Sequence, residues 1–117
     1  MALTVSLRNT MVDAATEEVS EVSLHDGDPG EEGDNELDGS GYSRQSVSFD
    51  DASGGSAPAD GDIVFDVPGD GTEVTHVGLW TDDGTFLAGG STTEESFSNP
   101  GTYTLTELTL SVNNPSS

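Results

Sequence analysis

Residues 73–90 read EVTHVGLWTDDGTFLAGG, and this stretch decides the fold. Its first half alternates β-branched and aromatic residues with polar ones, which predicts a strand. Val74 and Trp80 share one parity and Val77 and Leu79 share the other, so we expect this strand to be covered on both faces. We therefore expect Trp80 to be a core residue between the sheet and another layer. The Asp-Asp-Gly turn that follows predicts a β-hairpin.

Four more segments have the composition of strands, and Gly- and Asp-rich loops separate them. In the clearest of them, Ile63, Phe65 and Val67 lie on one face. In the last, the parity of the apolar residues changes, which predicts a bulge or bend near Thr106-Glu107. The four predicted strands cover 19–25, 42–49, 62–67 and 103–112. The predicted loops between them cover 26–41 and 50–61.

The N-terminal segment predicts a helix over 3–17, with Thr4 as its N-cap. Its apolar residues recur every three or four positions and form one stripe, which we expect to pack on the core. That stripe consists of Leu3, Leu7, Met11, Ala14 and Ala15.

A chain of 117 residues fits a single compact domain over 1–117. Short strands, frequent turns and one leading helix predict a mainly β fold, a small β-sandwich or jelly-roll-like domain. We assign the helix to 3–17, the β-sandwich to 19–112 and a flexible tail to 113–117. Because the core is thin, we expect self-association or docking on a larger assembly.

The chain is extremely acidic. It has 23 Asp and Glu against 2 arginines and no lysine, and its formal net charge is -21. This predicts the surface of a halophilic protein, because molar salt screens the repulsion and carboxylates keep the surface hydrated. The alternative is an acidic, partly disordered mesophilic protein.

The charge and composition exclude several functions. Two arginines cannot displace phosphate counterions, so we expect no nucleic-acid partner. An anionic membrane would repel the chain, and no apolar run has transmembrane length. The first ten residues lack the basic start and long apolar region of a signal peptide. The chain has no cysteine, so disulfides, thiolate metal sites and thiol nucleophiles are excluded.

The acidic loop, defined here as residues 26–41, contains candidate oxygen ligands for a cation. It does not fit the EF-hand spacing, because Gly30 stands at the fifth position and Glu31 replaces the glycine at the sixth. A solvated loop is the alternative. The candidate cation ligands are Asp26, Asp28, Glu31, Asp34 and Glu36.

His25 and His76 lie in predicted strands and could form a metal site with a neighbouring carboxylate, although packed histidines are the simpler interpretation. Arg44 is the cation nearest to the acidic loop, so we expect it to clamp the loop through Glu36. Pro29 favours a defined path for the loop. We identify no phosphate-binding loop and no G-x-S-x-G motif, so we expect no catalytic residues, no cofactor and no enzymatic activity.

Several motifs resemble a family of small virion proteins of tailed phages, often labelled tail fibre proteins. The resemblance spans most of the chain, and its main landmarks in this sequence are LHDGDPG (24–30), GDNE (33–36), YSRQ (42–45) and VTHVGLW (74–80). Asp26 replaces a threonine of the family pattern. The resemblance implies a structural protein of the virion exterior, in a fibre, baseplate or capsid decoration, with a role in host adsorption. Combined with the acidity, it implies a haloarchaeal tailed virus.

The resemblance also implies self-association, contacts with other virion proteins and a host-surface receptor as partners. A free cation- or glycan-binding β module that uses the acidic loop is the alternative function. The oligomeric state in molar NaCl would separate the two, because a fibre or ring component should self-associate without ligand.

Overall fold

The computed structural model describes residues 3–39, 41–106 and 108–111. This part of the chain is mainly β with one helix, as the sequence predicts. The elements are α1 (Val5–Glu18), β1 (Glu21–His25), β2 (Gln45–Ser46), β3 (Ser56–Pro58), β4 (Ile63–Val67), β5 (Thr72–Trp80), β6 (Phe86–Phe97), β7 (Gly101–Leu105) and β8 (Thr109–Ser111).

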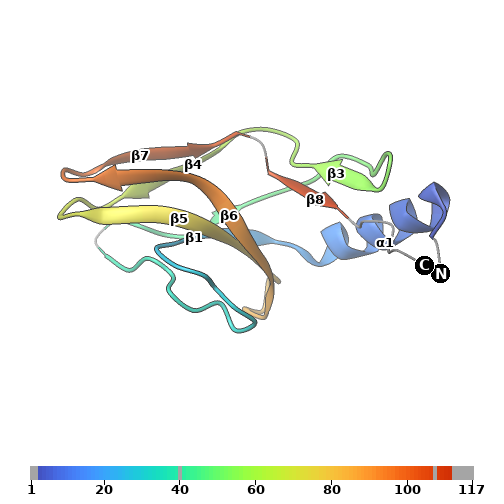
Figure 1. Ribbon diagram of the computed structural model, residues 1–117, viewed down its shortest axis with the longest axis horizontal. Helices are drawn as coiled ribbons and strands as arrows, with labels where there is room; N and C mark the ends of the chain where they lie inside the picture. The colour runs from blue at the N-terminus through green and yellow to red at the C-terminus, as the bar shows by residue number, and fades with distance from the viewer. Residues whose placement is uncertain (1–2, 40, 107, 112–117) are drawn as a thin grey trace.

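Three antiparallel sheets build the molecule (Figure 1). A four-stranded sheet has the order β2-β1-β5-β6, and the β4–β7 ribbon packs against one of its faces. The β3–β8 ribbon lies between these two layers and α1, and both of its strands contact the helix (Figure 1). The predicted β-sandwich is therefore confirmed. No helix in the described residues is long and apolar enough to cross a membrane.

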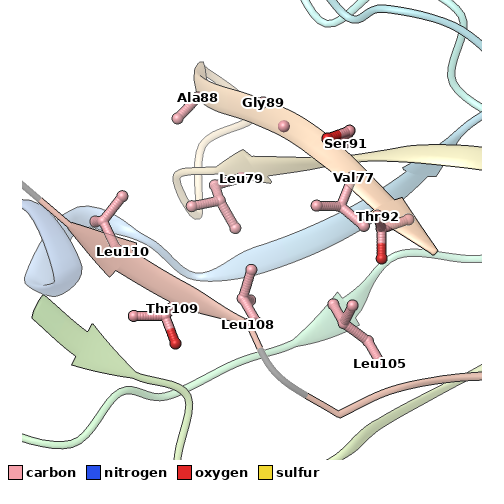
Figure 2. Close-up of a pocket in the computed structure, with 11 residues that line it drawn as sticks. Val77, Leu79, Ala88, Gly89, Ser91, Thr92, Leu105, Leu108, Thr109 and Leu110 are labelled. Carbon is pink, nitrogen blue, oxygen red and sulfur yellow. The ribbon is translucent and has the colours of Figure 1, made fainter.

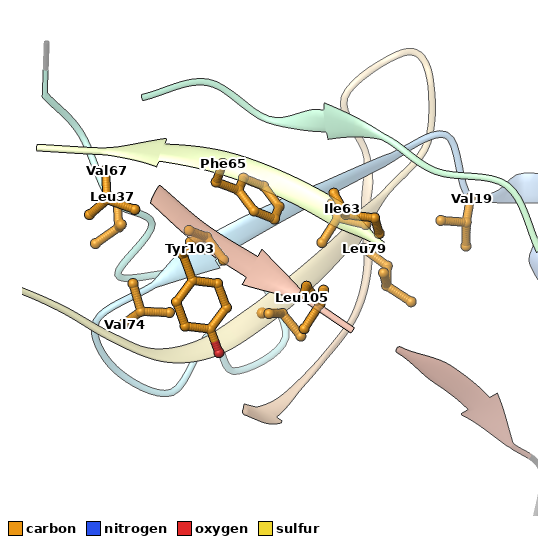
Figure 3. Close-up of a cluster of buried hydrophobic side chains, with 12 residues drawn as sticks. Val19, Leu37, Ile63, Phe65, Val67, Val74, Leu79, Tyr103 and Leu105 are labelled. Carbon is orange, nitrogen blue, oxygen red and sulfur yellow. The ribbon is translucent and has the colours of Figure 1, made fainter. Parts of the chain in front are cut away.

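The core lies between the four-stranded sheet and the β4–β7 ribbon (Figure 3). In β4 the side chains of Ile63, Phe65 and Val67 are buried and the two between them are exposed, which matches the predicted alternation. Tyr103 and Leu105 of β7 join the same cluster. Burying each of these large side chains contributes about 1.5–3 kcal/mol to folding.

The strand β5 differs from the predicted pattern at one residue. The β5–β6 pairing has a register shift between Val74 and His76, which reverses the parity of the strand at that point. Val74 therefore joins Val77 and Leu79 in the core instead of sharing a face with Trp80. Trp80 is 7% exposed, so the expectation that β5 is covered on both faces is confirmed.

The predicted strand over 103–112 is two strands in the structure. The first, β7, pairs with β4, whereas the second, β8, pairs with β3. Glu107, where a bulge was expected, and the predicted flexible tail over 113–117 lie outside the described residues.

Two other segments also differ from their predictions. In the predicted strand 42–49, only Gln45–Ser46 pairs as a strand, and Phe49 forms an isolated bridge with Ala59. The predicted loop 50–61 contains the strand β3, because the Ser56–Pro58 backbone finds a partner in β8.

The helix begins and ends close to its predicted limits, and Thr4 caps it by accepting a hydrogen bond from the Leu7 amide at 3.1 Å. The predicted buried stripe is wrong, because Val12 is fully buried whereas Leu7 and Met11 are exposed. Polar contacts explain why the helix buries a different side from the predicted one. Asn9 and Asp13, on the Val12 side of α1, accept hydrogen bonds from the Gly55 and Ala52 amides.

Candidate functional site: a polar layer beneath the acidic loop

The outer face of the four-stranded sheet carries polar and aromatic side chains instead of aliphatic ones. Alternation in β1 places Ser23 and His25 on this face, opposite Val22 and Leu24, which point into the core. Both polar residues have 0% exposure. The acidic loop covers this face.

The acidic loop runs along the part of β1 that β2 does not pair, before the chain returns to β2. The Asp26 amide donates to the Asn35 carbonyl, and the Leu37 amide donates to the Leu24 carbonyl. His25 and Glu36 thereby form an antiparallel bridge. The loop backbone is thus hydrogen-bonded to the strand and has a defined path.

A chain of hydrogen bonds crosses the polar layer. The Trp80 indole Nε1–H donates to Ser23 Oγ at 2.7 Å, and Ser23 Oγ lies 2.6 Å from His25 Nε2. His25 Nδ1 lies 2.7 Å from the Asp34 carbonyl oxygen. That oxygen can only accept, so Nδ1 carries the proton and Nε2 accepts from the Ser23 hydroxyl. The network therefore fixes one neutral tautomer of His25.

Burial lowers the pKa of His25 below its ordinary value, and the hydrogen bond to the Asp34 carbonyl only partly opposes that effect. In a protonated His25, Nε2 would carry a proton and could no longer accept from the Ser23 hydroxyl, so that hydroxyl would lose this acceptor. Desolvation and hydrogen bonding thus both favour the neutral ring.

Arg44 and Glu36 form a bidentate ion pair at the margin of this layer. Arg44 Nε donates to Glu36 Oε2 and Nη2 donates to Oε1, both at 2.9 Å. The guanidinium also lies over the Trp80 ring, with Cζ 3.6 Å from the ring centroid. A longer contact of 3.9 Å joins it to Glu21. The structure thus contains the Arg44–Glu36 pair that the sequence predicts.

Tyr42 is the third member of the clamp. Its hydroxyl donates to Glu36 Oε2 at 2.9 Å and accepts from the Leu24 amide at 3.0 Å. Burial on its own raises the pKa of Glu36, but the hydrogen bonds from Arg44 and Tyr42 outweigh it and leave the pKa below its usual value. Burial raises the pKa of Tyr42, and the hydrogen bond to Glu36 raises that of Arg44. All three groups keep their ordinary ionisation states at neutral pH.

Close packing holds the loop against the aromatic side chains. Phe86 meets the Trp80 ring edge-on, with centroids 5.0 Å apart. At Gly33 a Cβ would lie 2.5 Å from the Trp80 ring, and its φ of +78° also favours glycine. Pro29 is buried and packs against Gly89, where a Cβ would lie 2.8 Å from its ring.

The candidate cation ligands are not gathered into a site. The described residues contain no group of three or more His, Cys, Asp or Glu side chains arranged to hold a metal ion. Asp28 accepts a hydrogen bond from the Gly30 amide, and Glu36 is held by Arg44 and Tyr42. Asp26, Glu31 and Asp34 have exposed side chains.

His76 lies opposite His25 in the β1–β5 pairing, but its Nδ1 is bonded to the hydroxyl of Thr75 at 2.8 Å. The two imidazoles therefore do not share a ligand set with a carboxylate in the described residues.

Sequence reasoning missed Ser23, Gly78 and Phe86. Ser23 joins the indole to the imidazole, and Gly78 makes room for both groups, because a Cβ there would lie 2.7 Å from Ser23 Oγ and His25 Nε2. One signal was present in the sequence: Ser23 and His25 share a parity that Val22 and Leu24 do not. That alternation indicates a second, polar layer on β1.

The geometry of this network does not favour a chemical reaction. Ser23 and His25 stand at the distance of a nucleophile and its base, but both are fully buried and the imidazole Nδ1–H is directed at a carbonyl. In this conformation the pair is enclosed by the loop and the sheet. Its chemistry is that of a structural network.

An apolar cavity of about 210 Å³ opens on the other side of the sheet, where β8 diverges from β7. Figure 2 shows Val77, Leu79, Leu105, Leu108 and Leu110 around it. Among the described residues, its lining contains no charged side chain.

Residues 3–111 match the model of the family Gp80, described as podophage GP4 fiber I protein gp80. No curated protein and no solved structure matches the chain.

Proposed function

Because the chain belongs to the podophage GP4 fiber I protein gp80 family and is a virion component, we propose that it is a non-enzymatic structural subunit on the exterior of a tailed virus particle. It forms part of a fibre, a baseplate or a capsid decoration and contributes to host adsorption. The observation that carries the proposal is the family match, which extends from α1 to the end of β8.

The buried network supports a structural role over an enzymatic one. Within the polar layer, Ser23 and His25 have no exposed surface, and Arg44 and Glu36 neutralise each other. Hydrogen bonds of this kind rigidify a surface loop, and a rigid loop is what an external recognition or contact surface needs.

The shape of the molecule supports assembly with other copies and other virion proteins. The molecule extends 48 Å along its longest axis and about half as far along the other two, and α1 forms one end (Figure 1). In the described residues β2 and β6 are the edges of the main sheet, and β6 is 12 residues long. Unpaired strand edges are places where another chain adds hydrogen bonds.

The charge supports a halophilic setting, which we propose to be that of a haloarchaeal tailed virus. One of the chain's two cations, Arg44, is committed to Glu36 and the Trp80 ring. Little positive charge is left to compensate the exposed carboxylates, and only dissolved salt can screen them.

Two measurements test this function. Mass spectrometry of density-purified particles should detect the chain as a stoichiometric component. Purified protein added in excess should also slow the adsorption of particles to host cells, because it occupies the same receptors. Particles that lack the chain would overturn the proposal. Unchanged adsorption, with the chain present in the particles, would limit its role to structure.

A further inference from the structure

The helix α1 exposes an apolar stripe to solvent. Leu7 is 47% exposed and Met11 is 42% exposed, whereas Val12 on the opposite side is fully buried. The stripe continues at Ala14, which is also exposed. Leu7, Met11 and Ala14 follow the spacing of four and then three residues that is typical of a helix-to-helix seam.

The N-terminal half of α1 carries no negatively charged side chain. All 23 acidic residues lie from Asp13 onward, so the first two turns of α1 contain none, and Arg8 lies among them. Two copies that approach through any strongly acidic surface repel each other. They meet the lowest Coulomb barrier when they approach through the N-terminal half of α1.

We propose that the stripe of α1 packs against the α1 stripe of a second copy, with the two helices antiparallel. This inference rests on the self-association in the proposed function and specifies its surface. The contact is isologous, so Leu7 of each copy lies against Ala14 of the other, and the two Met11 side chains meet near the twofold axis.

The charges at the ends of α1 favour the antiparallel orientation of the two helices. Glu17 and Glu18 lie at the C-terminal end of α1, where the helix dipole disfavours anions. An antiparallel partner brings the positive end of its own dipole towards these two carboxylates. A parallel pair would instead bring the glutamates of both copies together.

The length and the exposure of α1 in a single copy are those of a helix that packs against another helix. A helix of 14 residues is marginal on its own in water, and Val12 is its buried residue. A second helix alongside would bury the exposed stripe.

Sedimentation equilibrium of the full chain in molar NaCl tests the contact. The wild type should sediment as a dimer, and the double variant Leu7→Glu, Met11→Glu should be a monomer with unchanged circular dichroism. The matched control is Val64→Glu, Leu87→Glu, which places two carboxylates on similarly exposed apolar residues outside α1. It should remain dimeric. A monomeric wild type, or a double α1 variant that still associates, would overturn the proposal.

Cysteine bridging tests the orientation, since the chain has no cysteine of its own. Leu7→Cys and Ala14→Cys chains, made with tags of different size, should form a mixed disulfide when combined under oxidation. Each variant alone should not bridge. Bridging within either single variant would indicate parallel helices and overturn the assignment.

These results are separable from the test of the proposed function. If the chain is present in particles but monomeric in solution, the helix contact fails and the virion role stands. If the chain dimerises through α1 but is absent from particles, the virion role fails and the contact stands.

Discussion

The ion pair between Arg44 and Glu36 joins the acidic loop to the sheet through one side chain. The guanidinium makes two hydrogen bonds to the carboxylate and stacks on Trp80, and its side chain is 28% exposed. A lysine in its place would keep the charge but lose the paired hydrogen bonds and the planar stacking. This residue therefore decides how firmly the loop is held.

We predict that Arg44→Lys destabilises the fold by about 1–2 kcal/mol and exposes the acidic loop to protease. Thermal melting in molar salt and limited proteolysis measure the two effects. The same substitution at the other arginine, Arg8→Lys, is the control and should leave cleavage of the loop unchanged. An Arg44→Lys protein that melts and resists protease like the wild type would show that the clamp contributes nothing.

Because of His25, the stability of the polar layer depends on pH. Burial lowers its pKa in the folded chain, so the unfolded chain takes up a proton more readily. The stability that the neutral ring contributes is complete above the unfolded pKa of about 6.5 and is lost as the pH falls through the folded value. The many surface carboxylates titrate too, so the effect of His25 is read as a difference between variants.

We predict that the gap in free energy of unfolding between wild type and His25→Gln narrows as the pH falls from 8 to 5. Only the wild type has to keep this imidazole neutral. Ser23→Ala is the comparison variant, because it retains the titrating ring, so its stability should still depend on pH, but less than that of the wild type, since the hydrogen bond that favours the neutral ring is lost. A gap that stays constant for His25→Gln would contradict the buried, neutral histidine. Chemical denaturation at each pH measures these quantities.

The strand β5 is the element that serves both layers of the molecule. Its register shift turns Val74, Val77 and Leu79 into the core while Gly78 and Trp80 face the acidic loop. At Gly78 the strand passes so close to Ser23, His25 and Phe86 that a Cβ would lie within 2.9 Å of each. The outer face therefore tolerates no side chain at this position.

We predict that Gly78→Ala destabilises the fold by about 1–3 kcal/mol through overpacking. It should also shift Trp80 fluorescence to the red, because the loop lifts from the indole. Gly90→Ala on the neighbouring β6 is the matched control, since a Cβ there meets nothing within 4 Å. If Gly78→Ala keeps the melting temperature and emission of the wild type, the described packing is wrong.

Local patterns in the sequence predict the elements whose burial is regular. The alternation in β4 and the Asp-Asp-Gly turn place their strands correctly, because each signal depends on neighbouring residues only. The bulge in β5 and the split between β7 and β8 depend on pairing with distant strands, which local pattern does not encode. The rotation of α1 has the same cause, since Asn9 and Asp13 bond a loop some forty residues away.

The candidate site also divides into contacts that local sequence predicts and contacts that depend on distant strands. Arg44 and Glu36 could be paired from sequence because the loop has few cations to choose from and the two residues are close in the chain. Ser23 acts through Trp80, which lies 57 residues later and reaches it only once β1 and β5 pair. Charge and proximity were therefore enough for the clamp but not for the buried network.

At the scale of the whole molecule, charge opposes compactness. A net charge of -21 on one small chain is screened within about 3 Å in molar salt but only within about 10 Å at 0.1 M. We predict that the melting temperature falls steeply between these salt concentrations and that the chain unfolds at the lower one. NaCl and KCl of equal concentration should act alike, because screening depends on ionic strength. A melting temperature that does not change with salt would contradict the halophilic interpretation.

The central claim is that this chain is a subunit on the exterior of a tailed virus particle. The most direct test is immunogold labelling of intact, purified particles with antibodies raised against the folded chain. We predict discrete label at a fixed location on each particle, on the tail or on the capsid surface. Particles that remain unlabelled when intact, whether or not mild opening exposes label, would contradict the claim.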